Sequence, residues 1–163
     1  MAYKEHGRRS LAKPLGQRLA AVVRAGWPLP GPLALVPIPA TPAAIRARHG
    51  DHMLRLARQA VRELAAGGRP AVVATPLRAH PRADSARLDR EQRAAAARSA
   101  FTVRWSQPRR LSALASVADA GAVVLVDDVL TTGATLAAAT EVLHRVGVPV
   151  AFAATLAATR RHS

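Results

Sequence analysis

The residues best suited to chemistry lie in one uninterrupted run, 123–135, which reads VVLVDDVLTTGAT. Its apolar start, typical of a strand buried on both faces, leads into the adjacent carboxylates of Asp127 and Asp128. An ionised carboxylate accepts hydrogen bonds and donates none, so the pair suits the hydroxyl groups of a sugar diol. The run therefore predicts a sugar-binding acidic pair at the carboxyl end of a parallel strand.

The second half of the run predicts a cup for a phosphate group beside those acids. Gly133 allows close approach of the main chain, and the apolar helix expected from residue 134 supplies bare N–H groups, including that of Ala134. Three threonine hydroxyls add donors, from Thr131, Thr132 and Thr135. The same residues could merely cap the helix, but a cap requires only one of them. A ribose 5-phosphate fits the acids and the cup together.

Two better-known phosphate motifs, G-x-x-x-x-G-K-[ST] and a strand-linked G-x-G-x-x-G, are absent. The run instead resembles the phosphoribosyl pyrophosphate (PRPP) signature of type I phosphoribosyltransferases: a hydrophobic strand, two acids, two further residues and T-T-G-x-T. This resemblance implies an α/β, parallel-sheet, three-layer type I phosphoribosyltransferase fold. It also implies catalysis by Asp127 and Asp128, PRPP contacts through residues 131–135, and Mg²⁺ that arrives on the substrate without a direct protein ligand.

Apolar periodicity predicts strands that alternate with helices, the pattern of a parallel sheet covered on both faces. Helices are expected at residues 11–25, 42–66, 90–98 and 134–146, the second with an irregular beginning. Strands are expected at residues 33–36, 71–75, 123–126 and 148–156, with an edge strand at 100–104 and a charged loop at 78–90. We expect an N-terminal helix and linker at 1–32, a phosphoribosyltransferase domain at 33–158 and a basic tail at 159–163.

A proline-rich turn is expected near the ribose phosphate, because ligands of open parallel sheets bind outside the carboxyl ends of the strands. The turn follows a predicted strand and consists of Pro37, Ile38 and Pro39. Its backbone N–H groups, together with Arg46 or Arg48, could hold the pyrophosphate that leaves. A structural turn with solvated arginines is the open alternative.

A basic lid is expected from the loop that contains Arg78, Arg82, Arg87, Arg90 and Arg93. Closed over a pyrophosphate, such a lid would exclude water and offset developing negative charge. Water exclusion matters because an activated ribosyl carbon would otherwise be hydrolysed. A solvated surface loop is the alternative for any single arginine of the set.

Longer stretches of the chain are similar to the ComF family of competence-associated, phosphoribosyltransferase-like proteins. Residues 35–39 (LVPIP) are similar to its V-P-V-P strand and turn, and residues 3–8 (YKEHGR) to its Y-K-x-x-G-R. Residues 46–52 (RARHGDH) resemble its R-x-R-G-[FH]-[ND]-[QH] segment with glycine and histidine exchanged. Residues 84–101 resemble a further segment, with Ala96 in place of an asparagine. Family members commonly begin with a cysteine zinc ribbon, whereas this chain contains no cysteine.

Composition narrows the remaining possibilities. A chain of 163 residues suffices for one domain, and the absence of cysteine excludes disulfides and thiolate metal sites. No apolar run approaches the length that spans a bilayer, so we expect a cytoplasmic protein without a membrane span; whether it forms an oligomer stays open. His49 and His52 stand one turn apart without a matching carboxylate cluster, so they predict no transition-metal site.

The chain is strongly basic, with 24 Lys+Arg against 10 Asp+Glu and a formal net charge of +14. Such a field attracts polyanions, which include nucleic acid and phosphorylated metabolites. Only 3% of the residues are aromatic, so few side chains could stack on bases. The charge therefore favours non-specific affinity for nucleic acid over recognition of bases.

Two functions agree with these observations. The first is a phosphoribosyltransferase-like protein that binds PRPP or a phosphoribosyl nucleotide and transfers the pentosyl group with release of pyrophosphate. The second is a non-catalytic PRPP or nucleotide sensor, or an adaptor that binds single-stranded DNA during DNA uptake. The second stays open because Thr131 stands where some nucleobase phosphoribosyltransferases place a carboxylate that acts on the base.

Overall fold

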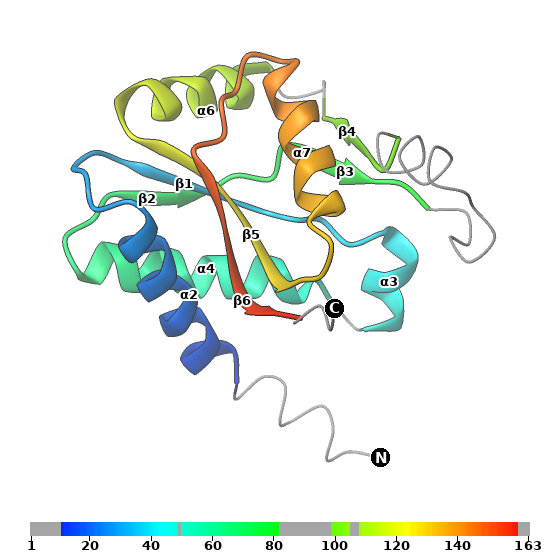
Figure 1. The fold of residues 1–163 in the computed structure, drawn as a ribbon, viewed down its shortest axis with the longest axis horizontal. Coiled ribbons are helices and arrows are strands. Elements are labelled where there is room, and N and C mark those ends of the chain that lie inside the picture. The colour runs from blue at the N-terminus through cyan, green and yellow to red at the C-terminus, as the bar shows by residue number, and fades with distance from the viewer. Residues whose placement is uncertain (1–10, 49, 82–98, 105–107, 160–163) are drawn as a thin grey trace.

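Four parallel strands form the centre of the molecule, and helices cover both faces of this sheet (Figure 1). The computed structural model describes residues 11–48, 50–81, 99–104 and 108–159. The strand order is β2-β1-β5-β6, with bounds Ala71–Val73, Leu33–Pro37, Ala122–Leu130 and Phe152–Ala158. The predicted α/β, parallel-sheet, three-layer fold is thereby confirmed.

The two faces of the sheet carry separate hydrophobic cores, because side chains alternate along each strand. One core lies under α2 (Ala12–Gly26) and α4 (His52–Ala66), and the other under α6 (Pro108–Ala120) and α7 (Ala134–His144). In β1, Leu35 belongs to the first core and Val36 to the second. All five residues of β1 are buried, so its sequence reads as a continuous apolar run. None of the helices in the described part of the chain is long and apolar enough to span a bilayer.

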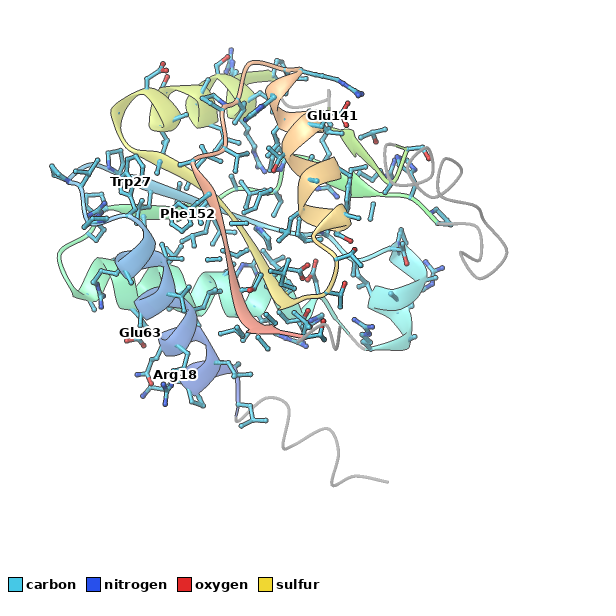
Figure 2. All side chains as sticks on the ribbon, in the orientation of Figure 1. Arg18, Trp27, Glu63, Glu141 and Phe152 are labelled. Atoms are coloured by element: carbon cyan, nitrogen blue, oxygen red, sulfur yellow. The ribbon has the colours of Figure 1, made fainter. Side chains whose placement is uncertain are left out.

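Two aromatic side chains pack against the core under α2 and α4 (Figure 2). Trp27 follows α2, and Phe152 begins β6. The ring of Phe152 lies so close to α2 that a Cβ atom on Gly26 would be 2.5 Å from its Cε2 atom. Glycine at this position therefore allows α2 to pack closely on the β6 edge of the sheet.

The single helix predicted over residues 42–66 is wrong, because two helices occupy this stretch, α3 (Pro42–Ala47) and α4. The link between them contains Gly50, whose φ of 136° is outside the helical range. Asp51 then caps the second helix, and its Oδ1 atom accepts the N–H of Leu54 at 3.0 Å. A side-chain oxygen that takes this N–H favours a new helix start over continuation of the previous helix.

A short antiparallel pair, β3 (Leu77–Ala79) and β4 (Phe101–Val103), contributes to the core under α6 and α7. Strand β4 confirms the edge strand predicted at 100–104. The loop predicted from residue 78 is wrong at residues 78 and 79, because these belong to β3. In both strands the outer residues are buried and the middle one is exposed, which is strand periodicity over only three residues. The helix predicted at 90–98 and most of the predicted loop lie outside the described residues. Helix α6 has no counterpart among the sequence-based predictions.

Strand β5 is longer than predicted, because its pairing with β6 continues as far as Leu130. Asp127 pairs with Thr155, so both aspartates belong to the strand and not to the loop after it. Hydrogen bonds of the sheet therefore fix the backbone that carries them. Strand β6 itself begins at Phe152, four residues later than the strand predicted from residue 148.

Candidate functional site

Two strand ends and two helix starts meet at one edge of the sheet (Figure 1). Pro37 at the end of β1 pairs with Val126 of β5, and the Ile38 N–H donates to the Val126 carbonyl at 3.0 Å. The turn at residues 37–39 therefore lies beside Asp127. Helix α7 follows β5 after a short loop, and the first residue of α4 contacts the end of β5.

Asp127 and Asp128 are consecutive residues of β5, and their carboxyl groups lie close enough to shift each other's pKa. Asp128 lies on the side of the sheet covered by α2 and α4, because its carboxylate contacts the first residue of α4. The Oδ1 atom of Asp127 accepts the backbone N–H of Asp128 at 2.9 Å. The end of β5 thus presents two neighbouring carboxyl groups.

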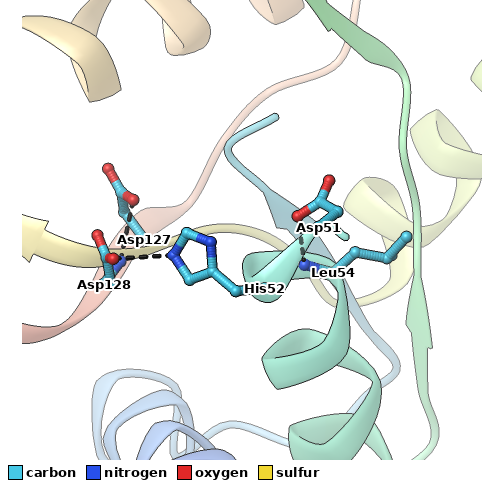
Figure 3. A network of polar contacts seen from close by, with 5 residues as sticks. All are labelled: Asp51, His52, Leu54, Asp127 and Asp128. Carbon is cyan, nitrogen blue, oxygen red and sulfur yellow. Dashed lines mark hydrogen bonds and ion pairs between the residues drawn. The ribbon is translucent and has the colours of Figure 1, made fainter. Parts of the chain in front are cut away.

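His52, the first residue of α4, is bound to Asp128 (Figure 3). Its Nε2 atom lies 2.9 Å from Oδ2 of Asp128, although 76 positions separate the two in the chain. The cap from Asp51 fixes the start of α4 and hence the position of the imidazole. Sequence reasoning considered His52 only as a metal ligand and missed this contact; its place at the final [QH] position of the 46–52 segment was the available signal.

The pKa values of the two carboxyl groups move in opposite directions. Burial raises the pKa of Asp127 above its usual value, and the negative charge of Asp128 raises it further. The hydrogen bond from the backbone N–H of Asp128 acts in the opposite direction and is outweighed. For Asp128, burial also acts to raise the pKa, but the hydrogen bond and charge of His52 and the N–H of Val129 lower it below its usual value. Asp128 is therefore the acid that its surroundings hold more firmly in the ionised form.

We expect Asp127→Asn to raise the melting temperature at pH 7. A carboxyl group whose pKa is higher in the folded than in the unfolded state destabilises the fold above both values, and asparagine removes that cost. Asparagine also keeps an oxygen that can accept the N–H of Asp128. The gain should vanish at about pH 3, where the carboxyl is protonated in both states. Thermal unfolding at the two pH values measures this, and a lower melting temperature of the variant at pH 7 would contradict the assignment.

The loop between β5 and α7 is open to solvent and ends in a left-handed glycine. Gly133 has φ 76° and ψ −6° at the N-cap of α7, where no side chain caps the helix. The N–H of Ala134 approaches Oγ1 of Thr132 at 3.4 Å, a long hydrogen bond. Thr131, Thr132 and Ala134 are exposed, and Gly133 and Thr135 are partly exposed. An exposed helix start with nearby hydroxyl groups has the donors and the dipole direction that a phosphate group requires.

A pocket of about 350 Å³ lies beside Asp128, between the starts of α2 and α4. Its walls combine apolar, cationic and acidic side chains: Leu11, Ala12, Leu15, Arg48, His52, Arg55, Leu56 and Asp128. We call it the α2–α4 pocket. Its volume is within the range of pockets that hold small organic ligands.

The structure brings only some of the predicted pyrophosphate residues together. Arg46 and Arg48 are both exposed, but only Arg48 lines the α2–α4 pocket with Asp128, and Arg46 lies on the short helix α3. The predicted lid residues Arg82, Arg87 and Arg93 lie outside the described residues.

The turn after β1 has fewer free backbone donors than its sequence suggests. The N–H of Ile38 is already bonded to the sheet, and Pro37 and Pro39 have no N–H. Donors for a pyrophosphate at this turn would therefore have to come from residues after 39. Pro37, Ile38 and Pro39 themselves therefore offer a pyrophosphate no free backbone N–H.

Among the described residues, no group of three or more His, Cys, Asp or Glu side chains could hold a metal ion. Mg²⁺ needs no such group when it arrives on a substrate, because it keeps several waters and binds phosphate oxygens with one or two carboxylates. Asp127 and Asp128 supply oxygen donors of this type at the end of β5. The donor set therefore fits substrate-borne Mg²⁺.

Comparison with known proteins agrees with this arrangement. The family model described as phosphoribosyl transferase domain matches residues 46–163, which is more than half of the chain and includes the whole of β5, the loop and α7. No curated protein matches the chain.

Proposed function

The chain belongs to the phosphoribosyl transferase domain family, and from this membership we propose that it binds PRPP, or a phosphoribosyl nucleotide, at the carboxyl edge of its sheet. Its four-stranded parallel sheet between helices matches the type I fold of that family. One observation carries the proposal: two carboxylates on a paired strand are followed directly by an open, left-handed loop at a helix start. Acceptors for sugar hydroxyls and donors for a phosphate are thus adjacent.

In this proposal, different residues at the carboxyl edge of the sheet bind different groups of PRPP. Asp127 and Asp128 accept hydrogen bonds from the ribose hydroxyls, directly or through metal-bound water. Residues 131–135 hold the 5-phosphate. The pyrophosphate extends toward the turn at 37–39 and Arg48, with Arg46 and the predicted lid arginines as further candidates. Bound Mg²⁺ would neutralise part of the pyrophosphate charge and so make it a better leaving group.

The proposed reaction is transfer of the pentosyl group. A nitrogen of the acceptor forms a bond to C1 of the ribose while the bond from C1 to the pyrophosphate oxygen breaks, and pyrophosphate leaves with the electron pair. Positive charge develops on the ribose ring, as in glycoside hydrolysis. The carboxylates at the end of β5 would therefore bind the transition state more tightly than the ground state. Thr131 offers no general base, so a proton on the attacking nitrogen must pass to solvent or to pyrophosphate.

The strong positive charge supports a second candidate function. A net charge of +14 would attract single-stranded DNA, and the resemblance to the ComF family suggests an adaptor role in DNA uptake. We therefore keep ComF membership, a cytoplasmic location and DNA binding as proposals.

Calorimetry with PRPP and Mg²⁺ tests the first proposal, and pyrophosphate release with a panel of acceptors tests catalysis. A salt titration of DNA binding tests the second. Affinity that depends on Z phosphate contacts should fall with a log–log slope of about −0.7Z for single strands. PRPP binding without pyrophosphate release would favour the sensor, and absence of PRPP binding would reject the proposed site.

A further inference from the structure

The α2–α4 pocket carries positive charge that no ion pair among the described residues neutralises. Arg48 and Arg55 both line it, and within the described residues neither forms an ion pair. Asp128 is the acid in the wall, and its Oδ2 atom is already bound by His52 at 2.9 Å. A ligand that fills the pocket is therefore favoured if it brings its own negative charge.

The side chain of Arg55 is exposed and lies close to the link between α3 and α4. Gly50 has a φ of 136°, and a Cβ atom at this position would lie 2.7 Å from Nη1 of Arg55. The guanidinium group therefore lies against the main chain at Gly50. Arg55 also lines the pocket, and a guanidinium group can offer parallel N–H donors that match the two oxygens of a carboxylate.

The rest of the pocket wall is apolar and partly open. Leu11 is 53% exposed although it is a large aliphatic residue, Leu15 is partly exposed, and Leu56 is buried behind them. A phosphate or pyrophosphate gains nothing from contact with leucine side chains. A flat ring would remove their apolar surface from water. The apolar wall of the pocket therefore favours binding of an organic ring over binding of a second phosphate group.

We propose that the α2–α4 pocket receives the acceptor of the pentosyl group, and that this acceptor is a small planar heteroaromatic ring that carries a carboxylate. The inference rests on the proposed PRPP site, because Asp128 borders both. The ring packs on Leu11 and Leu15, its carboxylate pairs with Arg55, and its nitrogen is directed toward the ribose held at Asp128. A neutral nucleobase would leave Arg55 without a counter-charge, because Arg48 is assigned to the pyrophosphate.

The test compares matched probes that differ only in charge. Pyridine-3-carboxylate and pyrimidine-4-carboxylate, each with its carboxamide, are titrated by calorimetry into the full chain saturated with PRPP and Mg²⁺. Each carboxylate should bind about three- to fivefold more tightly than its carboxamide, because an ion pair with an exposed arginine contributes about 1 kcal/mol at most. Arg55→Gln should abolish that difference and leave carboxamide binding within about twofold. Arg58→Gln should preserve it, because Arg58 is exposed on the same helix but is not part of the pocket.

A second variant tests the apolar wall. Leu11→Ser should weaken carboxylate and carboxamide by the same factor, because both rings lose the same contact. Since Leu11 is already half exposed, the substitution leaves the core intact.

The possible outcomes separate this inference from the proposed function. If PRPP binds but the paired probes have equal affinity, the acceptor inference alone is overturned. If Arg55→Gln weakens PRPP and leaves the carboxylates unaffected, the pocket cation serves pyrophosphate and the inference is again overturned. If wild-type protein does not bind PRPP, the proposed function fails and the acceptor role fails with it.

Discussion

Asp128→Asn is expected to weaken PRPP binding roughly 10- to 100-fold in the presence of Mg²⁺, measured by calorimetry. The substitution removes the acid that His52 keeps ionised and leaves a neutral group that accepts hydrogen bonds from the ribose less strongly. The contact with His52 occupies one of the several lone-pair positions of the carboxylate, so acceptors remain for a sugar. An amide oxygen can still accept from His52, so the fold should persist.

Asp119→Asn is the matched control for this prediction. Asp119 is exposed on α6 and its replacement changes the net charge by the same amount. PRPP affinity should stay within about twofold of wild type in this variant. If Asp128→Asn binds PRPP as well as Asp119→Asn does, the carboxylate has no role in holding the ribose.

Gly133→Val is expected to abolish detectable binding of PRPP and of ribose 5-phosphate while the chain still folds. At φ 76° a β-branched residue is strained by about 1–2 kcal/mol or more, so the loop must either bear the strain or rearrange. A Cβ atom here would meet only Cδ1 of Leu130, at 3.7 Å, an ordinary contact. The branched side chain would thus occupy the loop itself, where close approach of the phosphate to the main chain is required.

Gly147→Val separates backbone strain from loss of the site. Gly147 has φ 77°, and a Cβ atom there would meet no atom within 4 Å. Thermal unfolding should show similar destabilisation of the two variants, whereas calorimetry should show lost ligand binding only for Gly133→Val. Equal binding by both variants would mean that the phosphate lies elsewhere.

The sequence predicted those parts of the structure that depend on neighbouring residues. The apolar strands β1 and β5 and helices α2 and α7 follow from local periodicity, and the two acids with the Gly133 loop follow from one uninterrupted run. Prediction of secondary structure was weakest where only a few residues determine whether a helix or strand forms or ends. The cap from Asp51 divided a helix that periodicity alone made continuous, and β3 has too few residues for a clear pattern.

The sequence by itself determined the α/β class, the membership of the phosphoribosyl transferase domain family and the residue types at the end of β5, because these depend on contiguous residues. Only the tertiary structure decided what surrounds that chemistry. His52 reaches Asp128 from 76 positions away, and Leu11, Arg55 and Asp128 share a pocket because α2 and α4 pack on the same face of the sheet. Such contacts depend on the burial of two helices against a common core, and no local pattern encodes which side chains then meet.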